Sequence, residues 1–385
     1  HSQGVYPLRN ALADVLYIEE NRIQVVHVPG AGCYGHNGAD DVALDAVLAA
    51  RAFPGKPVLL KWERVDEHSW EPYGSAMQIE LKANLDKSGK VLYWNHETYS
   101  DTHLKRPSSH GKKSRLLASW HMQVPKQSPQ VKPLTGYHTG IHRNADPIYD
   151  FNDRRIVKHL VYNLPLRVST LRSLGAYANV FAIESFMDEL AHSCGSNPLE
   201  FRMDYLSDHR AKAVLKAAVE KANSRIISKN GGHGRGFALA RYKNAKCYAA
   251  VAVDLLVDDY GSIKLLRAVI AADAGQVIDP DGLRSQLEGG LIQSASWTLK
   301  EQVKFDEKGI TSQDWESYPI MTFADVPEIE TILIDRKDSP VLGAGEATQG
   351  PTAAAISNAV FDAVGLRLRR IPFTPEMVME AAAEA

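Results

Sequence analysis

The feature that most constrains the fold is a pair of apolar runs, residues 247–257 and 262–272, which are separated by a short polar turn. Apolar runs of this length, bounded by turn residues, predict strands of a buried sheet. Helices are expected after them at 283–299 and 352–364, and Gly365 follows the second helix as a C-terminal cap. This irregular order of strands and helices predicts an α+β fold, with mixed sheets and helices in two or more subdomains around a cleft.

The N-terminal half has elements of its own. Residues 22–29 alternate apolar and polar side chains like a strand, and a helix is expected after the glycine-rich stretch 30–38. A glycine cluster that begins at Gly231 is the candidate boundary between subdomains. We therefore expect a first subdomain at 1–230 and a second subdomain at 231–385.

Composition argues against several classes of function. The net charge is −2, and nonspecific binding of nucleic acid needs a concentrated basic surface, so no nucleic-acid partner is expected. The one dense basic run, 106–115, lies among Ser, Pro and Gly and is expected to be a solvated loop rather than a phosphate clamp. No apolar run is long enough for a membrane span.

The chain has three cysteines, Cys33, Cys194 and Cys247, which lie far apart in the sequence. Iron–sulfur clusters are usually held by about four cysteine thiolates, several of them closely spaced, and haem attachment needs two cysteines beside a histidine. Neither pattern is present, so electrons produced by a redox reaction would have to leave through another chain.

Gly30, Gly32 and Gly35 have the spacing of a dinucleotide-binding loop, and this loop lies between an expected strand and an expected helix. Backbone amides at the start of a helix suit a pyrophosphate. The acidic residue that should follow about 20 positions later is missing, because Arg51 and a Pro-Gly-Lys-Pro sequence occupy that region. An NAD-dependent dehydrogenase and a tight turn without a ligand are both kept as alternatives.

Two polar residues lie at expected starts of helices. Arg172 offers five donors in a fixed fork, which suits a phosphate or an oxygen-rich ligand, and a surface salt bridge is the alternative. Glu184 and Asp188, in the helix after it, are expected to be exposed charges. Gln286 follows a polar, glycine-rich turn, and its amide can both donate and accept hydrogen bonds to the edge of a ligand.

Glu346 lies in a loop of Gly and Ala directly before the helix at 352–364. One interpretation is that its carboxylate caps that helix. The other is a general base, which needs room beside it for a substrate. Residues 101–139 form a long irregular stretch, typical of functional or lid-like loops, and we expect substrate specificity to come from loops within 101–150.

Taken in order, these segments resemble the molybdenum-binding subunits of the xanthine dehydrogenase and aldehyde oxidase family, and most closely its nicotinate and isoquinoline dehydrogenase branch. The resemblance runs from His1 to about Pro372. It rests on three stretches, which read GAGCYGHNGADDVALDAVLAARAFPGKPV, then FAIESFMDELA and NPLEFRMDYL after Arg172, then GAGEATQGPTAAAISNAVFDAVGLRLRRIP. It implies a molybdenum cofactor-binding domain of the aldehyde oxidase type, as a C-terminal portion of the subunit.

The resemblance also implies roles for single residues. Glu346 matches the catalytic glutamate, a general base for the hydroxylation of an N-heterocycle or an aldehyde with water as the oxygen source. The implied cofactor-binding residues are Gln3, Gly32, Tyr34, Gly35, Arg172 and Gln286. The molybdenum would be held through the pterin, without a direct ligand from the protein, near Gln3, Tyr34 and Gly35.

The implied cofactor is a molybdenum–pterin, with its cytosine dinucleotide form as a candidate, and the implied partner is a small [2Fe–2S] subunit or an electron-carrier subunit. The family's GQG-type glycine loop and its Ser/Ala-rich segment have no counterpart here. In the isoquinoline-like branch they lie upstream. Because the chain opens on His1 rather than Met, we expect the first subdomain to be incomplete and an upstream portion of the same subunit to be missing.

Three classes of function therefore remain. The favoured class is a part of a molybdenum hydroxylase, in which the segments around Gly30, Arg172, Gln286 and Glu346 line one cleft. No counterpart is found of the residues that orient purines, which argues against xanthine as the substrate. The second class is a catalytically incomplete scaffold without cofactor, and the third is the NAD-dependent dehydrogenase.

Overall fold

The two apolar runs form the middle of a four-stranded sheet. Strand β9 (Tyr248–Val257) pairs antiparallel with β10 (Ile263–Asp273), and the order of the sheet is β13-β10-β9-β8. The outer strands are β13 (Glu328–Leu333), parallel to β10, and β8 (His233–Arg241), antiparallel to β9. The computed structural model describes residues 2–28, 30, 32–35, 38–103, 105–228 and 231–384.

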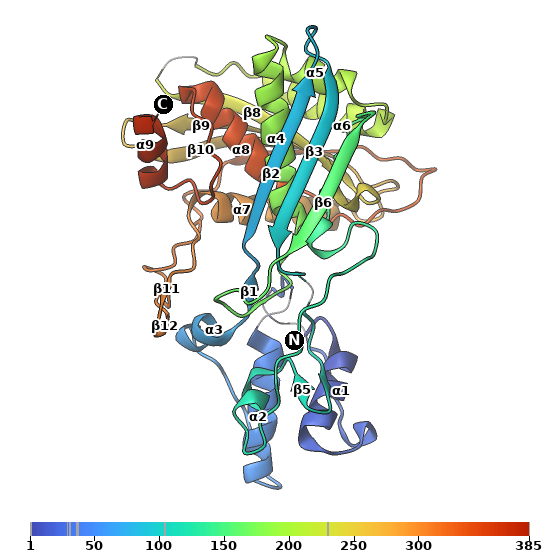
Figure 1. Cartoon of the computed structure of the whole chain (residues 1–385), viewed down its shortest axis with the longest axis vertical. Helices are drawn as coiled ribbons and strands as arrows, with labels where there is room; N and C mark the ends of the chain where they lie inside the picture. Colours follow the sequence, from blue (N-terminus) through green and yellow to red (C-terminus); the bar gives the residue numbers. More distant parts are fainter. Residues whose placement is uncertain are drawn as a thin grey trace.

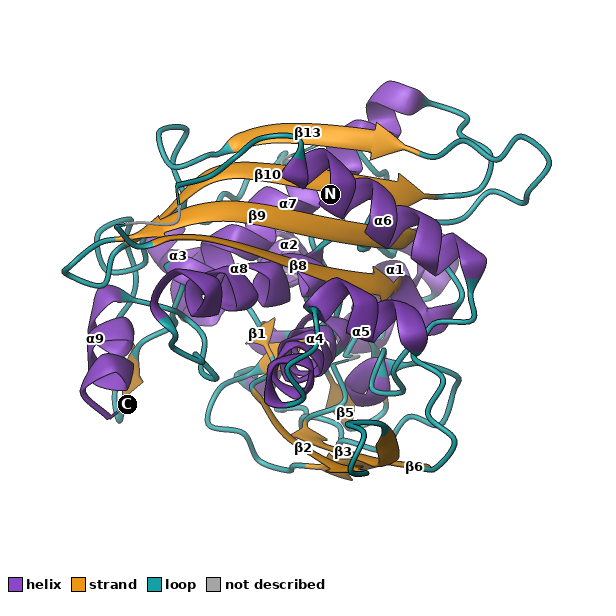
Figure 2. Cartoon of the chain, turned by 90° about the horizontal axis from the view of Figure 1, so that it is seen from above, coloured by secondary structure: helices purple, strands orange, loops and turns teal. Residues whose placement is uncertain are grey.

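Helices pack on both faces of this sheet (Figure 2). Successive side chains of a strand point to opposite faces, so neighbouring residues of β9 enter different cores. Tyr248 lies in the cluster that includes α6 (His209–Asn223), whereas Ala249 lies in the cluster that includes α8 (Gln349–Val364). Burial on both faces is the reason that the sequence of β9 is almost continuously apolar.

Close packing of α8 on β8 depends on two glycines. A Cβ atom on Gly234 would lie 2.1 Å from the carbonyl oxygen of Ala359, and one on Gly236 would lie 2.2 Å from its amide nitrogen. Any side chain at either position would push the helix away from the strand. These two glycines, which belong to the cluster that begins at Gly231, therefore fix how closely α8 approaches the sheet.

A second sheet lies below the first in Figure 2, with helix α4 (Ala176–Ser193) between them. Its order is β2-β3-β6, with β3 (Val91–Ser100) antiparallel to β2 (Met77–Leu85) and parallel to β6 (Arg154–Leu160). Helix α4 contacts β2, β8 and α8. Through these contacts it joins the two sheets into one packed body.

The N-terminal helices α1 (Val5–Leu16) and α2 (Gly38–Ala52) form the lower part of the molecule in Figure 1. They have a small core of their own, made by Leu8, Ala11, Leu12, Val15, Leu44 and Leu116. The strand expected at 22–29 is wrong: residues 23–28 have no regular structure. Val26 and Val28 are 68% and 56% exposed, so no neighbouring strand covers the alternating apolar side chains.

Helix α7 (Pro280–Leu299) packs against α8 and contributes Leu287, Leu291 and Ala295 to the core. The remaining elements are short. They are α3 (Arg64–Trp70), α5 (Pro198–Asp204), α9 (Pro375–Glu384), β1 (Tyr73–Gly74), β4 (Ser109–His110), β5 (Lys113–Ser114), β7 (Val168–Ser169), β11 (Phe305–Asp306) and β12 (Gly309–Ile310). Mixed sheets with helices confirm the α+β class, and the division at residue 230 stays a prediction. Within the described ranges, no helix has the length and apolar character of a membrane span.

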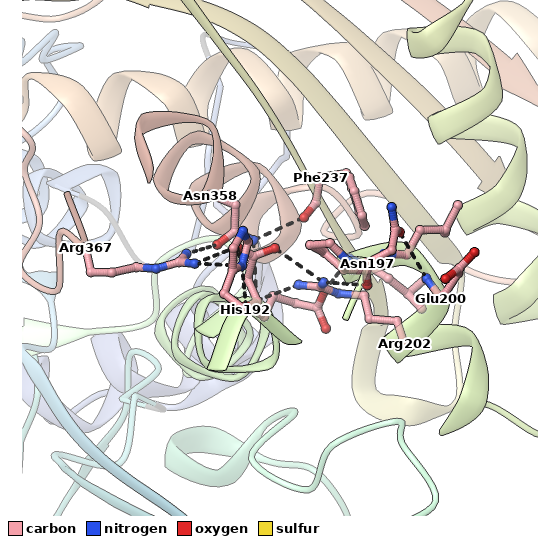
Figure 3. A network of polar contacts seen from close by, with 12 residues as sticks. His192, Asn197, Glu200, Arg202, Phe237, Asn358 and Arg367 are labelled. Carbon is pink, nitrogen blue, oxygen red and sulfur yellow. Dashed lines mark hydrogen bonds and ion pairs between the residues drawn. The ribbon is translucent and has the colours of Figure 1, made fainter. Parts of the chain in front are cut away.

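The charges of α4 were expected at the surface, and this expectation is wrong. Glu184 and Asp188 are 1% and 5% exposed. Arg202 of α5, which Figure 3 labels, is fully buried. It donates from Nε to Glu184 Oε2 at 3.0 Å and lies 3.5 Å from Asp188 Oδ1. The hydroxyl of Tyr149 and the amide of Leu239 also donate to Glu184, so the buried carboxylate is fully hydrogen-bonded.

This buried ion pair predicts a large effect on stability. Arg202→Met leaves the carboxylate of Glu184 buried without its cation, whereas Asp188 keeps Arg367 as a partner at 2.9 Å, and we expect the free energy of unfolding to fall by about 3–5 kcal/mol. Urea unfolding, followed by circular dichroism, measures this change. Arg225→Met is the matched control, because Arg225 is half exposed where it pairs with Glu328, and it should cost about 1 kcal/mol or less. Equal losses in the two variants would contradict the prediction.

Candidate functional site

Arg172 joins three of the segments that the sequence singled out. It lies in the loop between β7 and α4, and its Nε donates to the carbonyl oxygen of Gly345 at 2.7 Å. Its two terminal nitrogens donate to the carbonyl of Gln286 at 3.1 Å and to the side chain of Gln293 at 3.3 Å. The guanidinium therefore ties the loop before α8 to helix α7, and the expected alternative of a surface salt bridge is wrong.

The carboxylate of Glu346 is held by two donors from other segments. The backbone amide of Ser173 donates to Oε1 at 2.8 Å, and the hydroxyl of Tyr242 donates to Oε2 at 2.7 Å. The N-cap of α8, Thr348, makes no side-chain capping bond. Because both Glu346 oxygens accept from other elements, the interpretation of Glu346 as a helix cap is not supported.

Tyr242 is in turn hydrogen-bonded to an arginine. Arg143, which is 6% exposed, donates from Nη1 to the Tyr242 hydroxyl at 2.5 Å. Burial, and then the nearby charge of Glu346, raise the pKa of Tyr242 far above its usual value. The hydroxyl therefore keeps its proton and remains a donor to Glu346.

A left-handed turn brings the Ser173 amide to this position. Ser173 and Leu174 have φ values of 75° and 50°, which non-glycine residues rarely adopt. Such backbone strain is often found at functional sites. The hydroxyls of Ser173 and Thr170 are buried and have no hydrogen-bond partner among the described residues.

The glycine loop comes to the same place. Gly35 forms a bridge with Leu171, with φ of 137°, and a Cβ atom on it would lie 2.0 Å from the carbonyl oxygen of Thr170. The Tyr34 ring centroid is 5.7 Å from Cζ of Arg172. Burial lowers the pKa of Arg172, whereas the charges of Tyr34 and Glu346 raise it.

The remaining predicted residues lie around this centre. A Cβ atom on Gly32 would meet the Tyr34 ring at 2.5 Å, and Gln3 donates to the carbonyl of Cys33 at 2.8 Å. Gln286 is exposed, and its Oε1 lies 3.2 Å from the place that a Cβ on Gly345 would take. The structure therefore brings the Tyr34, Arg172, Gln286 and Glu346 segments together, with Gln3 at the edge.

The dinucleotide-binding alternative loses its structural basis. Such a loop follows a strand, and residues 23–28 form none. Ala31, His36 and Asn37 of the glycine stretch lie outside the described residues. Gly30 and Gly32 are described, but neither belongs to a strand-to-helix turn.

Sequence reasoning missed Tyr242, Arg143 and Ser173. Tyr242 and Glu346 are 104 positions apart, and Tyr242 and Arg143 are 99 positions apart. Nothing in the sequence around Tyr242 or Arg143 marks either residue. The one local signal was at Ser173, which follows Arg172 directly before the helix.

Comparisons with known proteins agree with this arrangement. A family model described as molybdopterin cofactor-binding domain matches residues 1–124 and 127–206, and a second model of the same description matches 185–327. The chain is 38% identical to one of the subunits of nicotinate dehydrogenase from Pseudomonas putida, over 99% of this chain and 32% of the relative. It is 25% identical to the beta subunit of isoquinoline 1-oxidoreductase from Brevundimonas diminuta, over 95% of this chain and 44% of the relative.

The fold is similar to that of a solved structure. Quinoline 2-oxidoreductase from Pseudomonas putida 86 matches 98% of this chain and 71% of its own chain, with a TM-score of 0.76 at 14% sequence identity. At this identity the likeness concerns the fold alone. The chain spans 32% and 44% of the length of the two curated relatives above.

Proposed function

This chain belongs to the family of molybdopterin cofactor-binding domains, and from this membership we propose that it is part of a molybdenum hydroxylase that oxidises an N-heterocycle or an aldehyde. The observation that carries the proposal is the position of Glu346, whose carboxylate is fixed by Ser173 and Tyr242 next to the Arg172 and Tyr34 segments. The names of the relatives support the two classes of substrate.

The residues present fit a cofactor rich in oxygen and nitrogen. Arg172 and Gln286 offer donors and acceptors to a pterin, and the bridge between Gly35 and Leu171 brings the backbone of the glycine loop next to Arg172. We assign Gln3, Gly32, Tyr34, Gly35, Arg172 and Gln286 as the residues that hold it. When bound, this cofactor supplies a two-electron oxidation with water as the oxygen source.

Glu346 has the geometry of a general base. A carboxylate has about four lone-pair positions, and the hydrogen bonds from Ser173 and Tyr242 occupy one on each oxygen. Each oxygen therefore keeps a position for a proton from the substrate side. Arg143 and Tyr242 fix the direction in which the carboxylate points, so that the acceptor is oriented before the substrate arrives.

We propose that electrons leave this chain through a partner. Among the described residues, no group of three or more His, Cys, Asp or Glu side chains could hold a metal ion. We propose a small [2Fe–2S] subunit, or another electron carrier, as the partner. We also propose that an upstream portion of the same subunit contributes the glycine loop that this sequence lacks.

Metal analysis tests the proposal. The complete protein, expressed with its partner and molybdenum, should contain molybdenum and oxidise members of a panel of N-heterocycles and aldehydes. Arg172→Gln should lose molybdenum, because the variant lacks the guanidinium that joins Gly345 to Gln286. The matched control is Arg284→Gln, on the exposed surface of α7, which should keep it. Folded wild-type complex without molybdenum or pterin would favour the scaffold alternative.

A further inference from the structure

A cavity of about 670 Å³ lies beside the candidate site, and the proposed reaction does not use it. Val168 and Ser169 of β7 line it, and Arg172 follows Ser169 three positions later in the chain. The other walls come mainly from the loops 115–131 and 162–167. Its volume falls in the range of about 300–1,000 Å³ that is usual for sites of small molecules.

The lining of this cavity has an excess of positive charge. Lys105 pairs with Asp101 at 2.6 Å, and Arg167 pairs with Asp41, which lies outside the lining, at 2.7 Å. In the part of the chain that the structure describes, Arg115 has no carboxylate within 4.0 Å and no hydrogen bond from its side chain. One guanidinium in the cavity wall therefore makes no direct ion pair with the described residues.

Arg115 is also half buried. The run 106–115 was expected to be a solvated loop. This expectation is confirmed for Lys112 and Lys113, which are exposed. It is wrong for Arg115, which is half buried and is followed by the fully buried Leu116. Burial lowers the pKa of Arg115, and the charge of Asp101 opposes this effect. Removing a cation from water is costly unless an anion meets it, and the fork of a guanidinium matches a carboxylate or a phosphate.

We propose that this cavity binds a small organic oxyanion, with Arg115 holding its carboxylate or phosphate group. Trp120, Tyr162, Val131 and Leu164 line the same cavity and supply apolar and aromatic surface for the rest of the molecule. The ligand class is thus a flat, partly apolar acid or phosphate ester. The proposal does not depend on the role of Glu346, because binding can be measured without turnover.

Calorimetric titration of the purified protein, in its complex if it requires one, tests the proposal at constant ionic strength. The probes are benzoate, phenyl phosphate and the neutral benzamide. At least one anionic probe should bind about tenfold or more tightly than benzamide, because a charge-assisted hydrogen-bonded pair contributes that much. Arg115→Gln should abolish this preference. The matched control Arg51→Gln removes an exposed guanidinium at the end of α2 and should retain it.

Each result has a defined meaning. Preference for benzoate identifies a carboxylic acid as the ligand class, and preference for phenyl phosphate identifies a phosphate ester. Equal affinity of the wild-type protein for benzoate, phenyl phosphate and benzamide overturns the proposal without any variant. An unchanged preference in Arg115→Gln also overturns it. If Arg115→Gln does not fold, Arg115→Lys keeps the charge but loses the fork and should weaken the preference severalfold.

Discussion

Glu346→Gln in the complete enzyme is expected to lower kcat by about 10²–10⁴-fold while the fold and the molybdenum content stay unchanged, because glutamine cannot accept the proton that a general base removes. Glutamine is nearly isosteric and keeps one of the two hydrogen bonds unchanged, because its carbonyl oxygen can accept from the Ser173 amide. Its amino group cannot accept from the Tyr242 hydroxyl, so that hydroxyl loses its present acceptor. Steady-state kinetics together with metal analysis measure the effect, which should appear in kcat rather than in KM alone.

The control for this variant is Glu200→Gln, an exposed carboxylate on α5 that should leave both kinetics and stability unchanged. A Glu346→Gln enzyme with full molybdenum and normal kcat would end the assignment of Glu346 as the base. In that case the role of the Glu346 carboxylate would be structural, since it joins the Ser173 turn to Tyr242.

Acidification is expected to destabilise the protein between pH 6.5 and 5, through three buried histidines. Burial lowers the pKa of His96, His103 and His138 to about 4 from the ordinary value of 6.5. The positive charge of Arg143 also lowers the pKa of His103 and the pKa of His138. The folded pKa lies below the unfolded pKa, so the unfolded chain binds more protons in this window and stability falls as the pH falls.

The expected loss is about 2 kcal/mol per histidine between pH 6.5 and 5, and it adds to the effect of any carboxylate that titrates lower. Urea unfolding at a series of pH values measures it. His103→Gln should reduce the slope, because one titrating group is removed, whereas His121→Gln changes an exposed histidine and should not. A free energy of unfolding that is independent of pH over this range would rule out the neutral, buried state of these histidines.

Much of the secondary structure could be predicted because its periodicity is strong. The helices expected at 283–299 and 352–364 are present as α7 and α8, each beginning three residues earlier than expected. The two apolar runs form β9 and β10 because both faces of their sheet are covered. The prediction of a strand at 22–29 was wrong. Alternation of apolar and polar residues is a property of one segment, and a strand also needs a neighbouring strand to pair with.

The candidate site could be predicted only in part. Glu346 and Arg172 were found because glycine-rich loops before helices draw attention to polar residues, and the resemblance then related them to each other. Tyr242 and Arg143 were not found, because their importance arises from contacts across about a hundred positions. Glu184 was predicted at the surface because the sequence does not show that α5 packs on α4 and brings Arg202 to it.

The environment of Glu346 is a property of the whole tertiary structure. Its two donors lie 173 and 104 positions away along the chain, and Arg172 reaches Gln286 across 114 positions. Closing loops of this length costs conformational entropy that only a completed core offsets. A synthetic peptide that contains the Glu346 loop would therefore have the carboxylate but not its donors. A search of other genomes for that short loop alone would find the same residues without the donors that orient the carboxylate.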